Sequence, residues 1–455
     1  MDLVVRNGIV YTPYGLVNAS IGVEDGKIAW MGRGAPEGGR ILDVDGKLVL
    51  PGMIDMHVHF RDPGSPERED FETGTMSAAA GGVTTVVEMP NTAPPVTSAE
   101  RLREKRRIVE GKAYVDFALV AGAGSMSREE IKPLAAEGAI AYKMFMISRF
   151  KELAVSDADM LENLLLIAET GLPCLVHAEN EELVSRGIER ARNLGRRDPL
   201  AHSEFRPPLA EAEATMRAIL LAEEASAHLH ICHMTSSEAL GFLSWAKGRG
   251  VKVTGETSPC YLLLSTDDLK RLGPYGKVDP PLREPEHQRA LWQALGSGLL
   301  DVVASDHAPY TREEKERGWS DIFDAPSGGV GVETTLPLML DSVDKGLLSL
   351  ERMVEVLSTN PARILGLYPR KGCISIGSDA DLVVVDPKAE FEIRGGALHS
   401  RQKITPFEGY RGRGKPILTI VRGKTVWEEG KIVGRPGYGR FLTPTYKKRC
   451  FDERF

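Results

Sequence analysis

The chain has 455 residues, 42% of them hydrophobic and 27% charged, with a formal net charge of −7 and a pI near 5.9. This length allows one large domain and a smaller one, and the composition is that of an ordinary globular protein. The acidic balance excludes nucleic acid as the main partner. No apolar run approaches the roughly 20 residues of a membrane span, so we expect no membrane association.

The N-terminus lacks the charged-then-apolar layout of a signal peptide. Five cysteines are scattered along the chain without CxxC spacing: Cys174, Cys232, Cys260, Cys373 and Cys450. An odd, dispersed set of this kind is typical of free thiols in a reducing compartment. We therefore expect a cytoplasmic protein.

Residues 1–50 contain short apolar runs such as Leu3–Val5 and Ile21–Val23, with a hairpin turn signal at Asp25-Gly26. Residues 366–455 have the same texture, with runs at Ala380–Val385 and Ile417–Val421. We interpret the two ends as the halves of one small β-sandwich, which the intervening domain interrupts.

Residues 51–365 alternate strand-like and helical patterns. The strand candidates after the first are Thr84–Met89, Tyr114–Val120, Ala139–Phe145, Pro173–His177, His228–His233, Val251–Thr254 and Leu300–Ala304. Regular alternation over this length indicates a parallel sheet, and the number of strands favours an α/β fold of the (β/α)8 TIM-like barrel type. A doubly wound open sheet is the alternative, but no GxGxxG turn supports it.

The first strand of this region, an apolar run from Leu48 to Ile54, leads into His57 and His59. Side chains alternate along a strand, so histidines two residues apart point the same way. Two converging imidazoles suit a divalent transition metal such as zinc.

Further ionisable residues fall where later strands end, at Lys143, His177, His233 and Asp306. In a barrel the catalytic groups gather at this face. Each of these residues also has an alternative explanation without a metal: the histidines as structural residues, the lysine as one that reaches solvent and the aspartate as an N-cap. Their joint occurrence at successive strand ends favours a metal centre.

Three residues near His233 in the sequence are expected to point away from the side that His233 faces. His228 and His230 have the opposite parity to His233, so we expect them to point outward in structural roles. Cys232 is likewise expected to face the opposite side of its strand from His233.

The chain strongly resembles the cyclic amidohydrolases, that is, dihydroorotases, allantoinases and hydantoinases. The matching segments are residues 51–59, 81–85, 306–309, 360–363 and 377–382. The resemblance covers essentially the whole length. It implies a distorted barrel with a flanking β-sandwich and a homodimer or homotetramer.

The resemblance also implies two zinc ions, bridged by carboxylated Lys143 and by a hydroxide. The implied metal ligands are His57, His59, Lys143, His177, His233 and Asp306. In such a site the hydroxide attacks the carbonyl of a small cyclic amide or ureide. Asp306 is the implied catalytic residue, which moves a proton from the hydroxide to the leaving nitrogen.

Different features of the chain favour different substrates, that is, different rings to be opened. Arg61 and Asn91 resemble the dihydroorotase residues that bind the substrate carboxylate, and this favours dihydroorotate, converted reversibly to N-carbamoyl-aspartate. The alternative for Arg61 is an ion pair with Asp62, Glu67 or Asp70.

Other stretches favour the allantoinase and hydantoinase (dihydropyrimidinase) branch. They are residues 143–146, 177–180 and 202–207, and Tyr310 stands where dihydroorotases carry a histidine. Some family members are non-catalytic scaffolds that have lost ligands, but all six positions are filled here. The charged segment 310–331 is either a lid over the site or an ordinary surface excursion.

Overall fold

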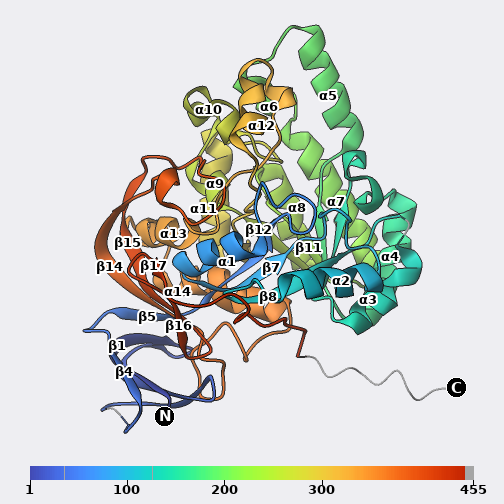
Figure 1. The fold of residues 1–455 in the computed structure, drawn as a ribbon. Coiled ribbons are helices and arrows are strands. Elements are labelled where there is room, and N and C mark those ends of the chain that lie inside the picture. Colours follow the sequence, from blue (N-terminus) through green and yellow to red (C-terminus); the bar gives the residue numbers. More distant parts are fainter. Residues whose placement is uncertain (35, 126, 446–455) are drawn as a thin grey trace, which may run out of the picture.

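A computed structural model describes residues 1–34, 36–125 and 127–445. Eight parallel strands follow one another in chain order around a barrel (Figure 1). They are β6 (Met53–Val58), β7 (Val83–Glu88), β8 (Asp116–Gly122), β9 (Ala141–Phe145), β10 (Cys174–His177), β11 (Leu229–Ile231), β12 (Val253–Thr257) and β13 (Val302–Val303). A parallel bridge between Val58 and His307 brings the last strand back to the first. The predicted barrel is confirmed.

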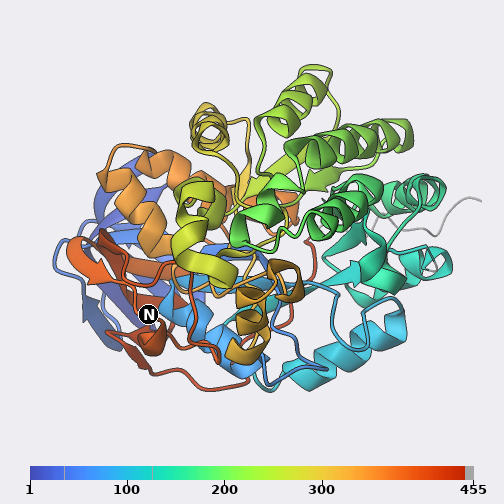
Figure 2. The ribbon, with the colours of Figure 1, turned by 90° about the horizontal axis from the view of Figure 1, so that it is seen from above.

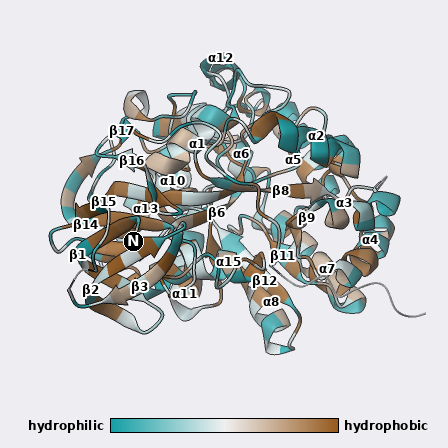
Figure 3. Cartoon of the chain, turned by 60° about the horizontal axis from the view of Figure 1, so that its bottom comes forward, coloured by the Kyte–Doolittle hydropathy of each residue, from teal (hydrophilic) through white to brown (hydrophobic). Residues whose placement is uncertain are grey.

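Helices surround the strands, as the view from above shows (Figure 2). They are α1 (Phe71–Ala80), α2 (Ala99–Val109), α3 (Ile131–Glu137), α4 (Asp157–Thr170), α5 (Glu181–Asn193), α6 (Pro199–Glu204), α7 (Pro208–Ala225), α8 (Ser237–Gly248), α9 (Pro259–Leu263), α10 (Thr266–Leu272), α11 (Pro285–Ser297), α12 (Arg312–Glu316), α13 (Thr335–Asp344), α14 (Leu350–Val354) and α15 (Asn360–Ile364). Hydrophobic residues gather on the strands, whereas outer helices such as α2 carry hydrophilic ones (Figure 3). The barrel strands are buried almost throughout, which explains their continuous apolar runs.

Strands from both ends of the chain form a second, separate sheet (Figure 1). From the N-terminal end come β1 (Leu3–Thr12), β2 (Gly15–Glu24), β3 (Lys27–Gly32), β4 (Arg40–Asp43) and β5 (Leu48–Pro51), and from the C-terminal end β14 (Leu382–Glu392), β15 (Arg411–Val421), β16 (Lys424–Glu428) and β17 (Lys431–Ile432). The two ends meet where β5 pairs antiparallel with β14. The sequence predicted that the two ends are the halves of one small β-sandwich, and their strands do come together, in one separate sheet.

The sequence predicted a single strand from Leu48 to Ile54, but the structure shows two strands there. The apolar run divides at Gly52 into β5, which belongs to the terminal sheet, and β6, which begins the barrel. A Cβ atom on Gly52 would lie 2.2 Å from the Thr84 hydroxyl oxygen, so only glycine lets the backbone approach β7 this closely. Gly52 therefore allows the chain to pass directly from one sheet to the other.

A buried charge cluster lies between the barrel and the terminal sheet. Lys371 donates to Asp116, at the start of β8, over 2.8 Å and also to Asp381, just before β14. Arg422 also pairs with Asp116. Buried charges are tolerated when they are paired, as they are here. The cluster thus links the barrel to the terminal sheet by ion pairs.

Within the described residues, no helix combines the length and hydropathy that crossing a membrane requires. Four of the cysteines, at positions 174, 232, 260 and 373, are free thiols. Cys450 lies outside the described residues.

Candidate active site

Four histidines and one aspartate converge at the carboxyl ends of the barrel strands. The Nε2 atoms of His57 and His59 lie 3.4 and 3.2 Å from Oδ1 of Asp306. His177 Nδ1 lies 3.1 Å from His233 Nε2, and the rings of His57 and His233 are 5.5 Å apart. The structure thus brings together five of the residues singled out in the sequence.

The backbone is strained at this place. Arg61, His233 and Asp306 have φ angles of 60°, 38° and 48°, in the left-handed region that residues other than glycine rarely adopt. Such conformations cost free energy and cluster at functional sites, where the surroundings enforce them. This local strain independently marks the same face of the barrel as functional.

In three of the histidines, one ring nitrogen is held by an oxygen that can only accept. His57 Nδ1 donates to Glu256 and His59 Nδ1 to Asn91, both over 2.7 Å. His177 Nε2 donates to Glu179 over 2.7 Å. These bonds fix the tautomer, so that the second nitrogen of each ring presents its lone pair to the centre of the site.

Sequence reasoning missed Glu179 and Glu256. Both are buried, with 0% and 1% of their surface exposed. A buried carboxylate at or just after a strand end was the available signal, since such a group needs a partner. Asn91 was predicted, but as a substrate contact. Its oxygen accepts from His59, which leaves its amide N–H groups to bind another acceptor.

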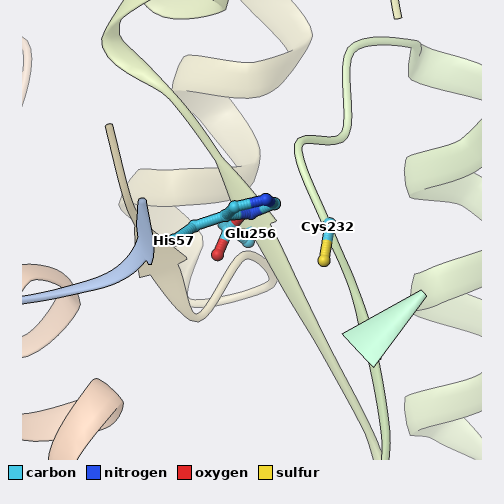
Figure 4. Close-up of side chains that lie close together, drawn as sticks. All are labelled: His57, Cys232 and Glu256. Atoms are coloured by element: carbon cyan, nitrogen blue, oxygen red, sulfur yellow. The ribbon is translucent and has the colours of Figure 1, made fainter. Parts of the chain in front are cut away.

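Lys143 lies fully buried beside the histidines, and its Nζ is 2.9 Å from the sulfur of Cys232. The prediction that Cys232 faces away from the site was wrong. Strand β11 ends at Ile231 and His233 adopts a left-handed conformation, so His233 points to the same side as Cys232 instead of the opposite one. Figure 4 shows the Cys232 thiol across from His57 and Glu256, which lie close together.

The outward orientation expected for His230 was also wrong. This side chain is fully buried, and its Nε2 lies 3.4 Å from the Glu256 carboxylate that binds His57. Its Nδ1 contacts the Thr254 hydroxyl at 2.8 Å, and His228 contacts the same hydroxyl at 3.2 Å. A hydrogen-bonded line thus runs behind His57 toward the opposite end of the barrel.

Burial and neighbouring charges set the pKa values of the site. Burial lowers the pKa of His59 to about 3, and burial also lowers the pKa of His177. For His57, burial acts in the same direction, but the Glu256 carboxylate outweighs it and raises the pKa to about 10. The second nitrogen of this ring therefore offers its lone pair only when a metal ion displaces its proton. Burial raises the pKa of Asp306, yet the facing imidazoles of His57 and His59 bring it below its ordinary value. Asp306 is therefore an anion at neutral pH.

These donors fit divalent metal ions. Imidazole lone pairs and a carboxylate face one another, and second partners orient the rings, as in known metal sites. Among the described residues, His57, His59 and Asp306 form one cluster with metal-ligand spacing. Another cluster, of three aspartates that include Asp116 and Asp381, is filled by the Lys371 ammonium group and needs no ion.

Arg61 lies beside this cluster without an acidic partner. Its side chain is 8% exposed, and its Nε has no hydrogen-bond partner among the described residues. Two of the acids considered as partners are taken, because Asp62 pairs with Lys112 and Asp70 with Arg401. Nor does the described part of the chain show an ion pair between Arg61 and Glu67.

Tyr310 lies between two guanidinium groups. Arg61 lies over its ring with Cζ at 4.8 Å from the ring centre, and Arg68 lies 5.0 Å from the same centre. Arg68 also donates to Glu314 over 3.1 Å. Tyr310 is therefore a direct neighbour of Arg61.

Segment 310–331 packs closely against the barrel. Within α12, the buried ammonium group of Lys315 donates to the carbonyl oxygens of Lys277, Pro326 and Gly328. The helix begins with a capping box in which Thr311 and Glu314 bind each other's backbone. Whether the segment also moves over bound substrate stays a prediction.

Residues 48–426 match the Amidohydrolase family. The chain belongs to this family. The allantoinase of Rubrobacter xylanophilus is 40% identical over 98% of each chain. The dihydroorotase of Methanothermobacter thermautotrophicus is 39% identical over 94% of each chain. The solved structure of L-hydantoinase (dihydropyrimidinase) from Arthrobacter aurescens superposes with a TM-score of 0.95, at 38% identity over 97% of this chain and 99% of that one.

This amidohydrolase is therefore an enzyme that hydrolyses cyclic amides. Its relatives carry three different names at nearly equal identity. The family alone thus leaves the ring undetermined, and the choice depends on this chain's own residues beside the cluster of histidines and Asp306.

Proposed function

We propose that this amidohydrolase opens the ring of dihydroorotate to N-carbamoyl-aspartate, and also catalyses the reverse reaction. The observation that carries the proposal is the buried Arg61 guanidinium, which has no acidic partner among the described residues. A buried cation needs an anion, and a substrate carboxylate can accept two parallel hydrogen bonds from it. The amide N–H groups of Asn91, fixed through His59, would complete the carboxylate site.

The proposed metal centre uses the six residues identified in the sequence. His57, His59 and Asp306 would hold one zinc ion, His177 and His233 the second, and carboxylated Lys143 would lie between the two. When bound, the ions lower the pKa of water and polarise the amide carbonyl. The Lys143 amine is buried and lies 2.9 Å from the Cys232 sulfur. A free ammonium group there would repel the two ions, whereas an anionic carbamate would not.

Asp306 is the proposed proton carrier. Its Oδ1 lies within 3.4 Å of both His57 and His59, so it faces the proposed position of the nucleophile. An ionised carboxylate in this position accepts the proton of the attacking water and delivers it to the ring nitrogen as the C–N bond breaks. The products are a carboxylate and a ureido group.

Hydrolysis of a neutral ring, as in a hydantoinase or allantoinase, is the second candidate. It is favoured by the absence of a histidine at Tyr310 and by the close superposition on an L-hydantoinase. A homodimer or homotetramer and a cytoplasmic location stay predictions of the sequence.

The test is a comparison of kcat/KM for dihydroorotate, allantoin, hydantoin and dihydrouracil with zinc-loaded protein. We expect dihydroorotate to be preferred by at least about 100-fold, since the other rings cannot neutralise Arg61. A preference for a neutral ring would overturn the proposal and favour the second candidate. A protein that purifies without stoichiometric metal and opens none of the rings would instead be a non-catalytic scaffold.

A further inference from the structure

A second buried polar cluster lies against His177, on the side away from the other histidines. It joins the residues that follow His177 to the stretch 202–207, and the sequence analysis gave no chemical role to either. Its members are Glu179, His202, Arg206 and Asp279, which are all less than 10% exposed, and the half-exposed Arg149.

Arg206 is the centre of this cluster. It pairs with both oxygens of Glu179, through Nε over 2.6 Å and through its second terminal nitrogen. Its remaining nitrogen donates to Asp279 over 2.7 Å. A planar guanidinium can bridge two carboxylates in this way, whereas the single ammonium group of a lysine cannot match the geometry.

Asp279 is itself held from several sides. Arg149 pairs with its second oxygen, and His202 Nε2 lies 3.1 Å from the first. The backbone carbonyl of Arg206 accepts a hydrogen bond from Arg283. The charges of Arg149 and Arg206 thus balance those of Glu179 and Asp279, which makes burial of this cluster tolerable.

The cluster acts on the proposed metal centre through one hydrogen bond. Glu179 accepts from His177 Nε2 over 2.7 Å, which leaves Nδ1 of the same ring 3.1 Å from His233 Nε2. Without Arg206, Glu179 would lose the two hydrogen bonds that fix its carboxylate beside the His177 ring. The ring could then rotate away from the orientation in which Nδ1 faces His233.

We propose that Glu179 and Arg206 are positioning residues for the metal centre. Arg206 keeps the Glu179 carboxylate in place, and Glu179 holds the His177 ring so that Nδ1 can bind the ion shared with His233. This inference rests on the proposed metal site but not on the identity of the substrate.

The experiment measures metal content in Glu179→Gln, which keeps the shape of the side chain and removes its charge. After dialysis against a chelator, we expect the wild-type protein to retain two zinc ions per chain. The variant should retain one, with about 10-fold to 100-fold faster loss of the other. Because Arg61 is untouched, kcat should fall in step with metal content while KM for the substrate stays within about threefold.

Arg206→Lys and Asp381→Asn complete the series. Arg206→Lys keeps the charge but cannot bridge both carboxylates, and we expect intermediate metal retention. Asp381→Asn removes a partner of the equally buried Lys371 at the junction of the two sheets and should keep both ions. Wild-type retention in Glu179→Gln would overturn the inference, and so would equal loss in Asp381→Asn, since the loss would then follow from general destabilisation. A wild-type protein without metal would instead overturn the metal site itself.

Discussion

The guanidinium of Arg61 lies over the ring of Tyr310, with Cζ at 4.8 Å from the ring centre. Tyr310 also contacts Arg68 at 5.0 Å, so the two arginines share one aromatic neighbour. They differ in that Arg68 pairs with Glu314, whereas Arg61 has no such partner among the described residues.

Arg61→Met should raise KM for dihydroorotate by about 100-fold and change KM for hydantoin by less than about threefold, because only the first substrate carries a carboxylate. Steady-state kinetics on both substrates make the measurement. Arg68→Met is the matched control, since it removes the other cation over Tyr310 and should leave both KM values nearly unchanged. Equal effects of Arg61→Met on the two substrates would contradict the assignment.

Lys143→Ala should lose bound metal and nearly all activity, because the proposed carbamate between the two ions can no longer form. Added short carboxylic acids should restore part of the activity by supplying a carboxylate in its place. Metal analysis and rates with and without propionate make the measurement. In the control Cys232→Ala, the nearest neighbour of the amine is removed and both metals should stay. Full metal content in Lys143→Ala would show that the lysine has no such role.

Asp306→Asn should lower kcat by about 1,000-fold, since the amide cannot accept the proton of the attacking water. Metal content measured on the same preparation separates loss of the proton carrier from loss of a ligand. Asp301→Asn is the control. Asp301 is a carboxylate of the same stretch that pairs with Lys247 over 2.7 Å, outside the site. If Asp306→Asn kept wild-type kcat, the proton would have another carrier.

His228 should make the protein less stable at acidic pH. Burial, assisted by the nearby His230, lowers its pKa to about 4, from about 6.5 in the unfolded chain. The unfolded state therefore binds the proton first as pH falls. The free energy of unfolding is unaffected by this group above pH 6.5, decreases between pH 6.5 and 4, and is constant below, with a total loss of about 3 kcal/mol.

His228→Gln should remove that part of the pH dependence. The side chain of His228 contacts the Thr254 hydroxyl, with Asp301 and Lys252 as its other charged neighbours. Denaturant unfolding of both proteins at several pH values between 4 and 8 makes the measurement. Only the difference between the two proteins counts, because acid also affects the metal site of both. Parallel curves would mean that His228 keeps an ordinary pKa in the folded state.

The sequence by itself determined the architecture and the central donors. Parallel barrel strands are buried on both faces, so they appear as apolar runs, and charged residues where such runs end are conspicuous. Alternation along β6 was sufficient to predict that His57 and His59 point the same way. Short apolar runs at both ends, with a hairpin turn signal at Asp25-Gly26, were sufficient to predict that the two ends form one β-structured unit, because they are local signals.

The tertiary structure decided how those donors are held. Glu256 binds His57 from 199 residues away, and Asn91 binds His59 from 32 residues away, so no local pattern relates them. Alternation failed at His233, because β11 ends at Ile231 and the left-handed backbone of His233 turns its side chain to the same side as His230 and Cys232. Asp62 and Asp70 are unavailable to Arg61 because they pair with Lys112 and Arg401, and only the packing of the folded chain determines these pairs. Local periodicity can be recognised in the sequence, whereas buried charges find their partners only when distant strands and loops come together in the folded chain.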